Sequence, residues 1–217
     1  MPVPPTLRWL FGLTVAAVIV AVPTVHYRAV YNHGRRLRAV EPGVLYRSGA
    51  LTVEGFKDAV AQLGIKTIIN LQDEFPDPAL RNSYFDTRTS SEVEMCKSLG
   101  VRYLYIAPDL IPRHQVGRER PKAIEQFLAV MDDPSNYPVL VHCKAGLHRT
   151  GCMVAVYRQE YQGWTAYAAL QEAKANGFGE WASTADNDYI VQYITTYQRR
   201  CAEIRNPKSE IRNPKQI

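Results

Sequence analysis

Cys143 and Arg149 are the two residues of this sequence whose types and spacing most clearly define a chemistry. An apolar run, residues 139–141, leads into Cys143, and a helical pattern of apolar residues begins just after Arg149. This order predicts a buried strand, a short loop and the N-terminus of a helix. The cysteine opens the loop and the arginine closes it.

The loop between these two residues has the features of an anion-binding site. A helix N-terminus carries unpaired N–H groups and the positive end of the helix dipole, and oxyanions bind there readily. Gly146 allows a positive φ where the loop turns most tightly, and the Arg149 guanidinium can bind two phosphate oxygens at once. The backbone amides expected to face the phosphate are those of Lys144, Ala145, Gly146, Leu147 and His148.

The same electrostatic field favours the thiolate form of Cys143, which is the nucleophilic form. A thiolate that faces a bound phosphate predicts covalent phosphoryl transfer, and the leaving oxygen then needs a proton from a general acid on a separate loop. Asp109 directly follows the predicted strand 101–107 and lies 34 positions before Cys143, so it is our candidate for this acid. The weaker candidates are Glu119, Asp132 and Asp133.

The string H-C-K-A-G-L-H-R-T-G at 142–151 resembles the signature of the cysteine-dependent protein tyrosine and dual-specificity phosphatases. The segments V-L-Y-R-S-G at 44–49 and L-G-I-K-T-I-I-N-L at 63–71 extend the resemblance to the atypical dual-specificity branch of bacteria, plants and fungi. The resemblance implies an enzyme that hydrolyses phosphate monoesters, on phosphotyrosine and also on phosphoserine or phosphothreonine. It implies a phosphocysteine intermediate and neither a metal nor a cofactor.

The resemblance also implies roles for individual residues. By this resemblance, the Thr150 hydroxyl assists the departure of Cys143 when water attacks the phosphocysteine. His142 orders the loop through hydrogen bonds and is not a base. The Asp109 assignment follows the family pattern of an acid some thirty residues before the cysteine, but no Trp precedes the Pro-Asp dipeptide here.

The sequence leaves alternatives open for the substrate and also for the class of function. The loop string, with Lys144 and His148, also resembles phosphoinositide phosphatases and the plant and fungal enzymes that act on inositol pyrophosphates; Lys144 can equally be a solvated loop lysine. An alternative of another class is a non-catalytic phosphate-binding module that recruits phosphoproteins or lipids. The presence of both Cys143 and Arg149 argues against that module.

Composition and charge limit the kinds of binding partner that we expect for this chain. The 217 residues are 46% hydrophobic and 22% charged, which suits one globular domain with tails. The net charge of +5 comes without an aromatic-interleaved basic patch, so no nucleic-acid partner is expected. No C-x-x-C pair occurs, so no metal site is predicted. For Cys96 and Cys152, core packing is favoured over a protective disulfide with Cys143.

Residues 9–25 are uncharged and apolar on all sides, and their length suits a single membrane-spanning helix. A signal peptide that is cleaved on export and a buried core helix are the alternatives. The proline-rich stretch 1–8 is expected to be disordered. The arginines that follow the segment are Arg28, Arg35, Arg36 and Arg38. This flank places the remainder of the chain in the cytoplasm by the positive-inside rule.

Strand and helix patterns after this segment predict a single α/β domain over 41–200, with a short central sheet of about four or five strands flanked by helices. Residues 26–40 are expected to form a basic linker, and the repeats 203–209 and 210–216 place a polar tail over 201–217. The expected strands are 44–47, 65–71, 101–107 and 139–141. The expected helices are 52–63, 91–100, 121–131, 150–161, 165–176 and 186–201, and 72–89 is expected to be a loop. Arg47 and Asn70 are candidates to brace the loop after Cys143.

Overall fold

The computed structural model describes residues 4–72, 75–107, 120–179 and 188–200. Its centre is a five-stranded sheet in the order β1-β2-β7-β3-β6. The strands are β1 Arg38–Glu41, β2 Leu45–Gly49, β3 Thr67–Asn70, β6 Arg102–Tyr105 and β7 Val139–Cys143. All neighbours pair in parallel except β1 with β2, so β7 lies in the middle, between two parallel strands. The predicted α/β domain with its short central sheet is confirmed.

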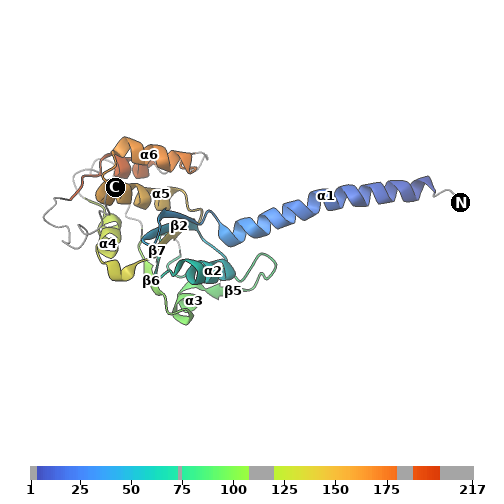
Figure 1. The fold of residues 1–217 in the computed structure, drawn as a ribbon, viewed down its shortest axis with the longest axis horizontal. Helices are drawn as coiled ribbons and strands as arrows, with labels where there is room; N and C mark the ends of the chain where they lie inside the picture. Colours follow the sequence, from blue (N-terminus) through green and yellow to red (C-terminus); the bar gives the residue numbers. More distant parts are fainter. Residues whose placement is uncertain (1–3, 73–74, 108–119, 180–187, 201–217) are drawn as a thin grey trace, which may run out of the picture.

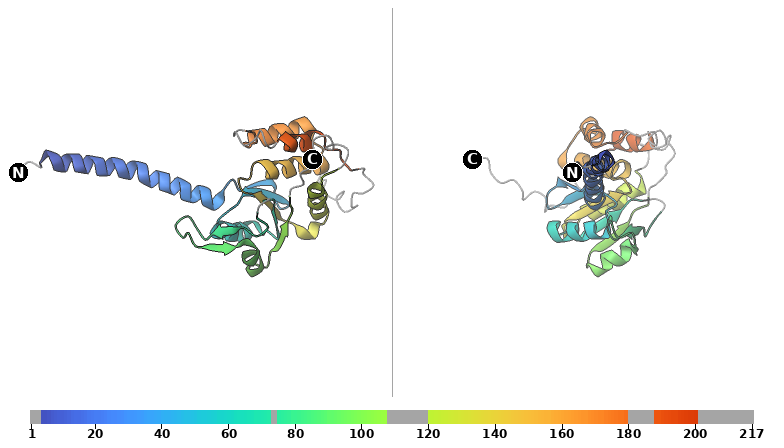
Figure 2. Two further views of the ribbon diagram at one scale, coloured as in Figure 1. Left: turned by 180° about the vertical axis from the view of Figure 1, so that it is seen from behind. Right: turned by 90° about the vertical axis from the view of Figure 1, so that its right-hand side faces the viewer.

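Helices cover both faces of this sheet (Figures 1 and 2). On one face lie α2 Val53–Leu63 and α3 Glu92–Ser98. On the other face lie α4 Lys122–Met131, α5 His148–Gln162, α6 Ala166–Ala175 and α7 Asp188–Thr195. A short 3-10 helix, Pro134–Asn136, turns the chain from α4 into β7.

The position of β7 between two layers of helices explains why its sequence is apolar at almost every position. Successive side chains of a strand point to opposite faces, and here both faces carry helices. Val139, Val141 and Cys143 belong to the core under α4 and α5, whereas Leu140 belongs to the core under α2 and α3. All five residues of β7 are buried. The strand therefore places Cys143 at the carboxyl end of the sheet, in a fully packed position.

The capping residues read from the sequence define several helices as expected. The Thr52 side chain accepts from Gly55 N at 3.1 Å, and Ser91 accepts from Glu94 N at 3.1 Å, so each hydroxyl satisfies an otherwise unpaired helix amide. Gly64 ends α2 in the left-handed conformation. Pro121 is the N-cap of α4 rather than a member of its first turn. Helix α5 begins at His148, with Leu147 as its N-cap, which is two residues earlier than predicted.

Two regions that were expected to lack strands contain them. The expected loop 72–89 contains β4 Ala79–Arg81, which pairs with β5 Thr89–Ser91 in a separate two-stranded antiparallel sheet. The expected linker 26–40 contains the start of β1. These strands are three or four residues long and lack apolar alternation, so only their pairing with another segment makes them strands.

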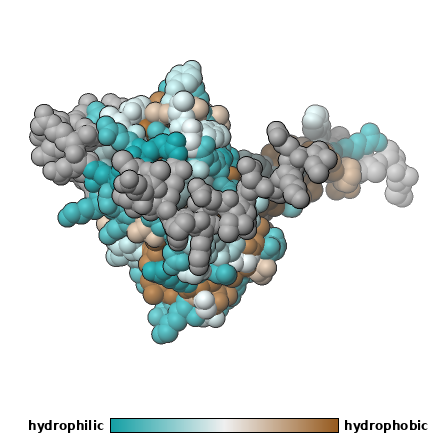
Figure 3. Space-filling view, turned by 60° about the vertical axis from the view of Figure 1, so that its left-hand side comes forward, coloured by the Kyte–Doolittle hydropathy of each residue, from teal (hydrophilic) through white to brown (hydrophobic). Residues whose placement is uncertain are grey.

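Helix α1, Pro5–Gly34, projects away from the sheet and helices (Figure 1). It begins within the stretch 1–8 expected to be disordered and continues through most of the expected linker 26–40. The helix is long and apolar enough to cross a membrane, and no residue of its most apolar window is buried. Hydrophobic side chains are visible along it where it leaves the domain (Figure 3). The alternative of a buried core helix is therefore wrong.

Candidate functional site

Cys143 is the last residue of β7, and Arg149 lies in the first turn of α5. The loop 144–147 joins them, so the strand, loop and helix occur in the order that the spacing predicted. Cys143 is almost completely buried, and the backbone N–H of Gly146 donates a hydrogen bond to its Sγ at 3.3 Å. The loop therefore directs a backbone donor at the sulfur.

Gly146 occupies a position that no other residue fits. Its φ is +73°, which disfavours residues with a side chain. A Cβ built at this position would lie 2.5 Å from both the Ser48 carbonyl oxygen and the Gly49 nitrogen, which are backbone atoms of β2. The loop therefore turns tightly because it packs directly against the end of β2.

Two carbonyl groups of the loop are held on its outer side by residues at the end of β2. The Ala50 N–H donates to the Lys144 oxygen at 3.2 Å, and Arg47 Nη2 donates to the Gly146 oxygen at 2.8 Å. The C=O and N–H of one trans peptide unit point in opposite directions. Fixing these two oxygens outward therefore turns the N–H groups of the following residues, Ala145 and Leu147, toward the interior of the loop.

Arg47 is the buried brace of this arrangement, with 2% of its surface exposed. Burial, followed by the nearby Arg38, lowers the pKa of Arg47 to about 10, so the guanidinium stays charged at neutral pH. Asn70 acts elsewhere: its amide donates to the Phe75 carbonyl and to the Tyr103 hydroxyl, each at 2.9 Å. Of the two residues suggested to brace the loop, Arg47 contacts it, whereas Asn70 orders the chain after β3.

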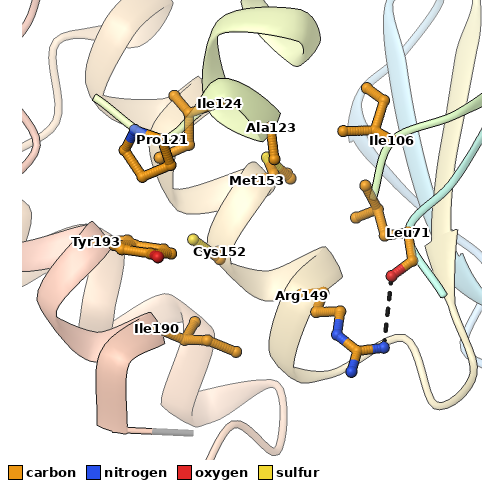
Figure 4. A pocket seen from close by; sticks show the side chains of 10 residues that line it. All are labelled: Leu71, Ile106, Pro121, Ala123, Ile124, Arg149, Cys152, Met153, Ile190 and Tyr193. Carbon is orange, nitrogen blue, oxygen red and sulfur yellow. Dashed lines mark hydrogen bonds between the residues drawn. The ribbon is translucent and has the colours of Figure 1, made fainter. Parts of the chain in front are cut away.

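Arg149 borders an apolar cavity of about 30 Å³ (Figure 4). Its Nη1 lies 3.5 Å from the Leu71 carbonyl oxygen, at the chain segment that follows β3. The other lining side chains come mostly from α4, α5 and α7, and all but those of Tyr193 and Cys152 are hydrocarbon or thioether groups. The guanidinium therefore lies between the polar loop and an apolar space.

Thr150 and Cys152 follow Arg149 inside α5. Thr150 is fully buried, and its Oγ1 has no hydrogen-bond partner among the residues that the structure describes. Burial raises the pKa of Cys152 to about 12; burial and the nearby carboxyl groups of Glu92 and Asp77 do the same for Cys96. Both are free thiols packed in the core, as favoured from the sequence.

His142 points to the face of β7 opposite to Cys143, because neighbouring residues of a strand alternate. Its Nε2 shares a hydrogen bond of 2.7 Å with Oε1 of Glu92, and both residues are fully buried. The imidazole also packs against the Phe56 ring in a T-shaped arrangement, with 5.3 Å between ring centres. Glu92 is a residue that sequence reasoning missed, since nothing local signals that the first residue of α3 is buried against His142, fifty positions away.

The side chains at the rim of the loop differ in exposure. Lys144 is exposed to solvent, whereas His148 is partly buried and packs edge-on against Phe178 at 5.5 Å between ring centres. Burial and the neighbouring Arg149 lower the pKa of His148, which favours its neutral imidazole. The rim therefore offers one exposed positive charge and one neutral ring.

The candidates for the general acid separate into two groups. Asp109 and Glu119 lie outside the described residues. Asp132 accepts two hydrogen bonds from Arg200, at 2.6 and 2.8 Å, and another from Tyr161. Asp133 caps the short 3-10 helix by accepting from Ser135 N. The carboxylates of Asp132 and Asp133 thus both accept hydrogen bonds that hold parts of the fold together.

We expect the buried Glu92–His142 hydrogen bond to contribute to stability. Glu92→Ala should lower the free energy of unfolding by about 1–3 kcal/mol, because it leaves a buried imidazole nitrogen without its partner. Glu92→Gln should lose less, since an amide can still bond to the ring. Denaturant unfolding measures both, and Glu94→Ala, an exposed position two residues along α3, is the control. Equal losses at positions 92 and 94 would contradict the assignment.

Comparison with known proteins gives consistent results. A family model described as "DSP-PTPase phosphatase fused to NAD+ Kinase" matches residues 21–190. The chain is 29% identical over 162 residues to the inositol diphosphatase DSP3 of Arabidopsis thaliana, covering 75% of this chain and 71% of that protein. It is 54% identical over 43 residues to the dual specificity protein phosphatase TpbA of Pseudomonas aeruginosa, which is 20% of each chain.

Solved structures show the same fold. The core catalytic domain of the PP-IP phosphatase SIW14 from Saccharomyces cerevisiae superposes with a TM-score of 0.54 at 23% identity, over 75% of this chain and 85% of that one. TpbA of P. aeruginosa superposes with a TM-score of 0.51 at 25% identity, over 72% and 83%. With the family model matching most of the chain, this protein belongs to the atypical dual-specificity branch of the cysteine-dependent phosphatases.

Proposed function

We propose that this phosphatase acts on phosphotyrosine, and also on phosphoserine or phosphothreonine, in proteins, with Cys143 as its nucleophile. The observation that carries the proposal is the hydrogen bond from Gly146 N to Cys143 Sγ, inside a loop whose carbonyls at Lys144 and Gly146 are held outward. A phosphoryl group seated over the sulfur would meet the inward N–H groups. Arg149 is proposed to bind two of its oxygens.

The proposed reaction has two steps. The Cys143 thiolate attacks phosphorus, the bond from phosphorus to the substrate oxygen breaks, and Asp109 gives its proton to that oxygen. Water then attacks the phosphocysteine, Asp109 takes a proton from this water, and the phosphorus–sulfur bond breaks to restore the thiolate. The Thr150 hydroxyl, buried and next to Arg149, is proposed to stabilise the departing sulfur. The loop amides stabilise the charge on the transferring group in both steps.

Inositol pyrophosphates or phosphoinositides are the second candidate substrates. The support comes from relatives named as inositol diphosphatases, one of which matches 75% of this chain, and from the exposed Lys144 at the rim of the loop. An exposed ammonium adds charge for a ligand with several phosphates without restricting its shape. The phosphoprotein and inositol candidates share the Cys143 chemistry and differ in the groups around the phosphate.

A substrate panel tests this function directly. The full chain, purified in detergent, should hydrolyse a phosphotyrosine peptide, and the rates on a phosphoserine peptide and an inositol pyrophosphate rank the candidates. Cys143→Ser should reduce turnover more than about 10³-fold, because a hydroxyl at this site is a poor nucleophile, while the variant still binds phosphate. Malachite-green phosphate release measures the rates. Undiminished hydrolysis by Cys143→Ser would end the proposal.

The general acid has its own test. Asp109→Asn should lower kcat about 100-fold on a phosphotyrosine peptide and much less on an aryl phosphate with a good leaving group. Because the acid must be protonated in the first step, kcat/KM of the wild type should fall as pH rises through the pKa of the acid, and the variant should lose this dependence. Asp133→Asn is the control. A full effect from Glu119→Gln instead would move the assignment to Glu119.

We also propose that α1 anchors the enzyme in a membrane with the catalytic domain in the cytoplasm. The supporting features are the unburied apolar window of α1 and the arginines that follow it. Export after cleavage of the segment is the alternative, and it would give a shortened mature chain. The anchor would hold the phosphatase at substrates near the membrane surface.

The anchor is tested by alkaline carbonate extraction of membranes that contain the full chain with a C-terminal tag. The intact chain should stay in the membrane pellet at its full mass, and the tag should be accessible only from the cytoplasmic side. Val18→Arg combined with Ile19→Arg should release the chain, since each charge at a helix centre costs about 2.5–3.5 kcal/mol of insertion free energy. A shortened chain in the exported fraction would support the signal-peptide alternative instead.

A further inference from the structure

The catalytic loop has a third outward carbonyl, and the group that holds it comes from the end of α1. Arg36 Nη1 donates a hydrogen bond to the Ala145 oxygen at 3.1 Å, across 109 positions of sequence. Arg36 is the second residue after α1. It is a non-glycine residue with a positive φ, +61°, a conformation that persists only where surrounding contacts hold it.

The Ala145 oxygen belongs to the same peptide unit as the Gly146 N–H. That N–H is the group that donates to Cys143 Sγ at 3.3 Å. Because the peptide unit is planar and its C=O and N–H point in opposite directions, the bond from Arg36 sets the direction of the N–H that faces the nucleophile. Arg36 and Arg47 thus hold two successive carbonyls of the loop, Ala145 and Gly146.

The backbone around Arg36 is tied to the domain on several sides. The Gly49 N–H donates to the Arg35 carbonyl at 2.8 Å, and Arg35 Nη1 donates to the Ala50 carbonyl at 3.2 Å. The end of α1 also approaches α2 so closely that a Cβ at Gly55 would lie 2.1 Å from the His33 oxygen. Arg36 itself lies over the ring of Tyr31, at 5.4 Å from its centre. These contacts place the guanidinium against the loop.

We infer that Arg36 is a positioning residue of the phosphate-binding loop, so that the junction between α1 and the domain is part of the active-site structure. The inference rests on the proposed role of Cys143 and is independent of whether α1 lies in a membrane. A residue that merely ended the helix would use only its backbone, and any side chain compatible with the positive φ would serve. A positioning residue needs a donor that reaches the Ala145 oxygen.

The test compares Arg36→Gly, Arg36→Lys and the control Arg28→Ala in the full chain purified in detergent. Glycine accepts the positive φ, so this variant removes the donor without adding backbone strain. Lysine keeps the charge and one donor group. Arg28 is an exposed arginine of α1. The measurements are kcat and KM with p-nitrophenyl phosphate, the affinity for orthovanadate by its effect on Tm, and Tm without ligand.

We expect Arg36→Gly to lower kcat about 10- to 100-fold and to weaken vanadate binding, with KM changed far less and with Tm close to that of the wild type. Arg36→Lys should recover a large part of both losses, and Arg28→Ala should behave as the wild type. An unchanged kcat and vanadate affinity in Arg36→Gly would overturn the inference. So would a loss of Tm and kcat together that lysine fails to restore, because that result indicates a structural role only.

Wild-type turnover in the same assay is a separate outcome that tests the phosphatase chemistry. Vanadate is an oxyanion and binds without being hydrolysed, so its affinity compares the variants even if p-nitrophenyl phosphate is a poor substrate. If the wild type binds vanadate and Arg36→Gly does not, the positioning role holds whatever the natural substrate is. If both bind equally, the role fails while the proposed function stands.

Discussion

The structure depends on the orientation of a few peptide units in the loop after Cys143. A tight loop can direct several N–H groups toward one anion only if its carbonyl groups point away, and carbonyls turned into the protein need donors of their own. Ala50 N–H and Arg47 supply these donors from the end of β2, which lies beside β7. Gly146 is required because β2 backbone atoms occupy the space of a side chain. The pairing of β2 with β7 thus determines the conformation of the loop after Cys143.

The alternation of side chains along β7 gives two residues that are adjacent in sequence different surroundings. Cys143 faces the core under α5, where the Gly146 amide donates to its sulfur, whereas His142 faces α2 and α3, where it bonds to Glu92. Burying a polar pair is tolerable only when each group finds its partner. Through Nε2 of His142 and Oε1 of Glu92, the pair connects α3 to the strand that ends in Cys143. The His142 ring thus contacts Glu92 and Phe56, on the face of β7 opposite to the Cys143 sulfur.

Position in the fold also sorts the three cysteines that the structure describes. Cys96 and Cys152 lie within the core, where burial raises the pKa of each to about 12, so they remain protonated thiols. Cys143 lies at a strand end that meets a helix N-terminus and an amide donor. Place in the fold matters for α1 as well: its apolar side chains are not buried. The residue Arg36, which follows α1, contacts the loop. Residue type alone therefore predicts neither the burial of a side chain nor its contacts.

The sequence by itself determined the features that depend on neighbours along the chain. The strand, loop and helix around Cys143, the N-caps Thr52 and Ser91, and the apolar segment within α1 were all predicted, because capping bonds and periodic burial act over a few residues. Only the tertiary structure decided the partners that lie far apart in sequence: Glu92 for His142, Arg36 for the Ala145 carbonyl, and the pairing of β1 with β2 and of β4 with β5. It also decided between the two suggested braces, since Arg47 bonds to the loop whereas Asn70 bonds elsewhere. A hydrogen bond across fifty or a hundred positions leaves no local pattern, since the sheet and its covering helices bring its two ends together.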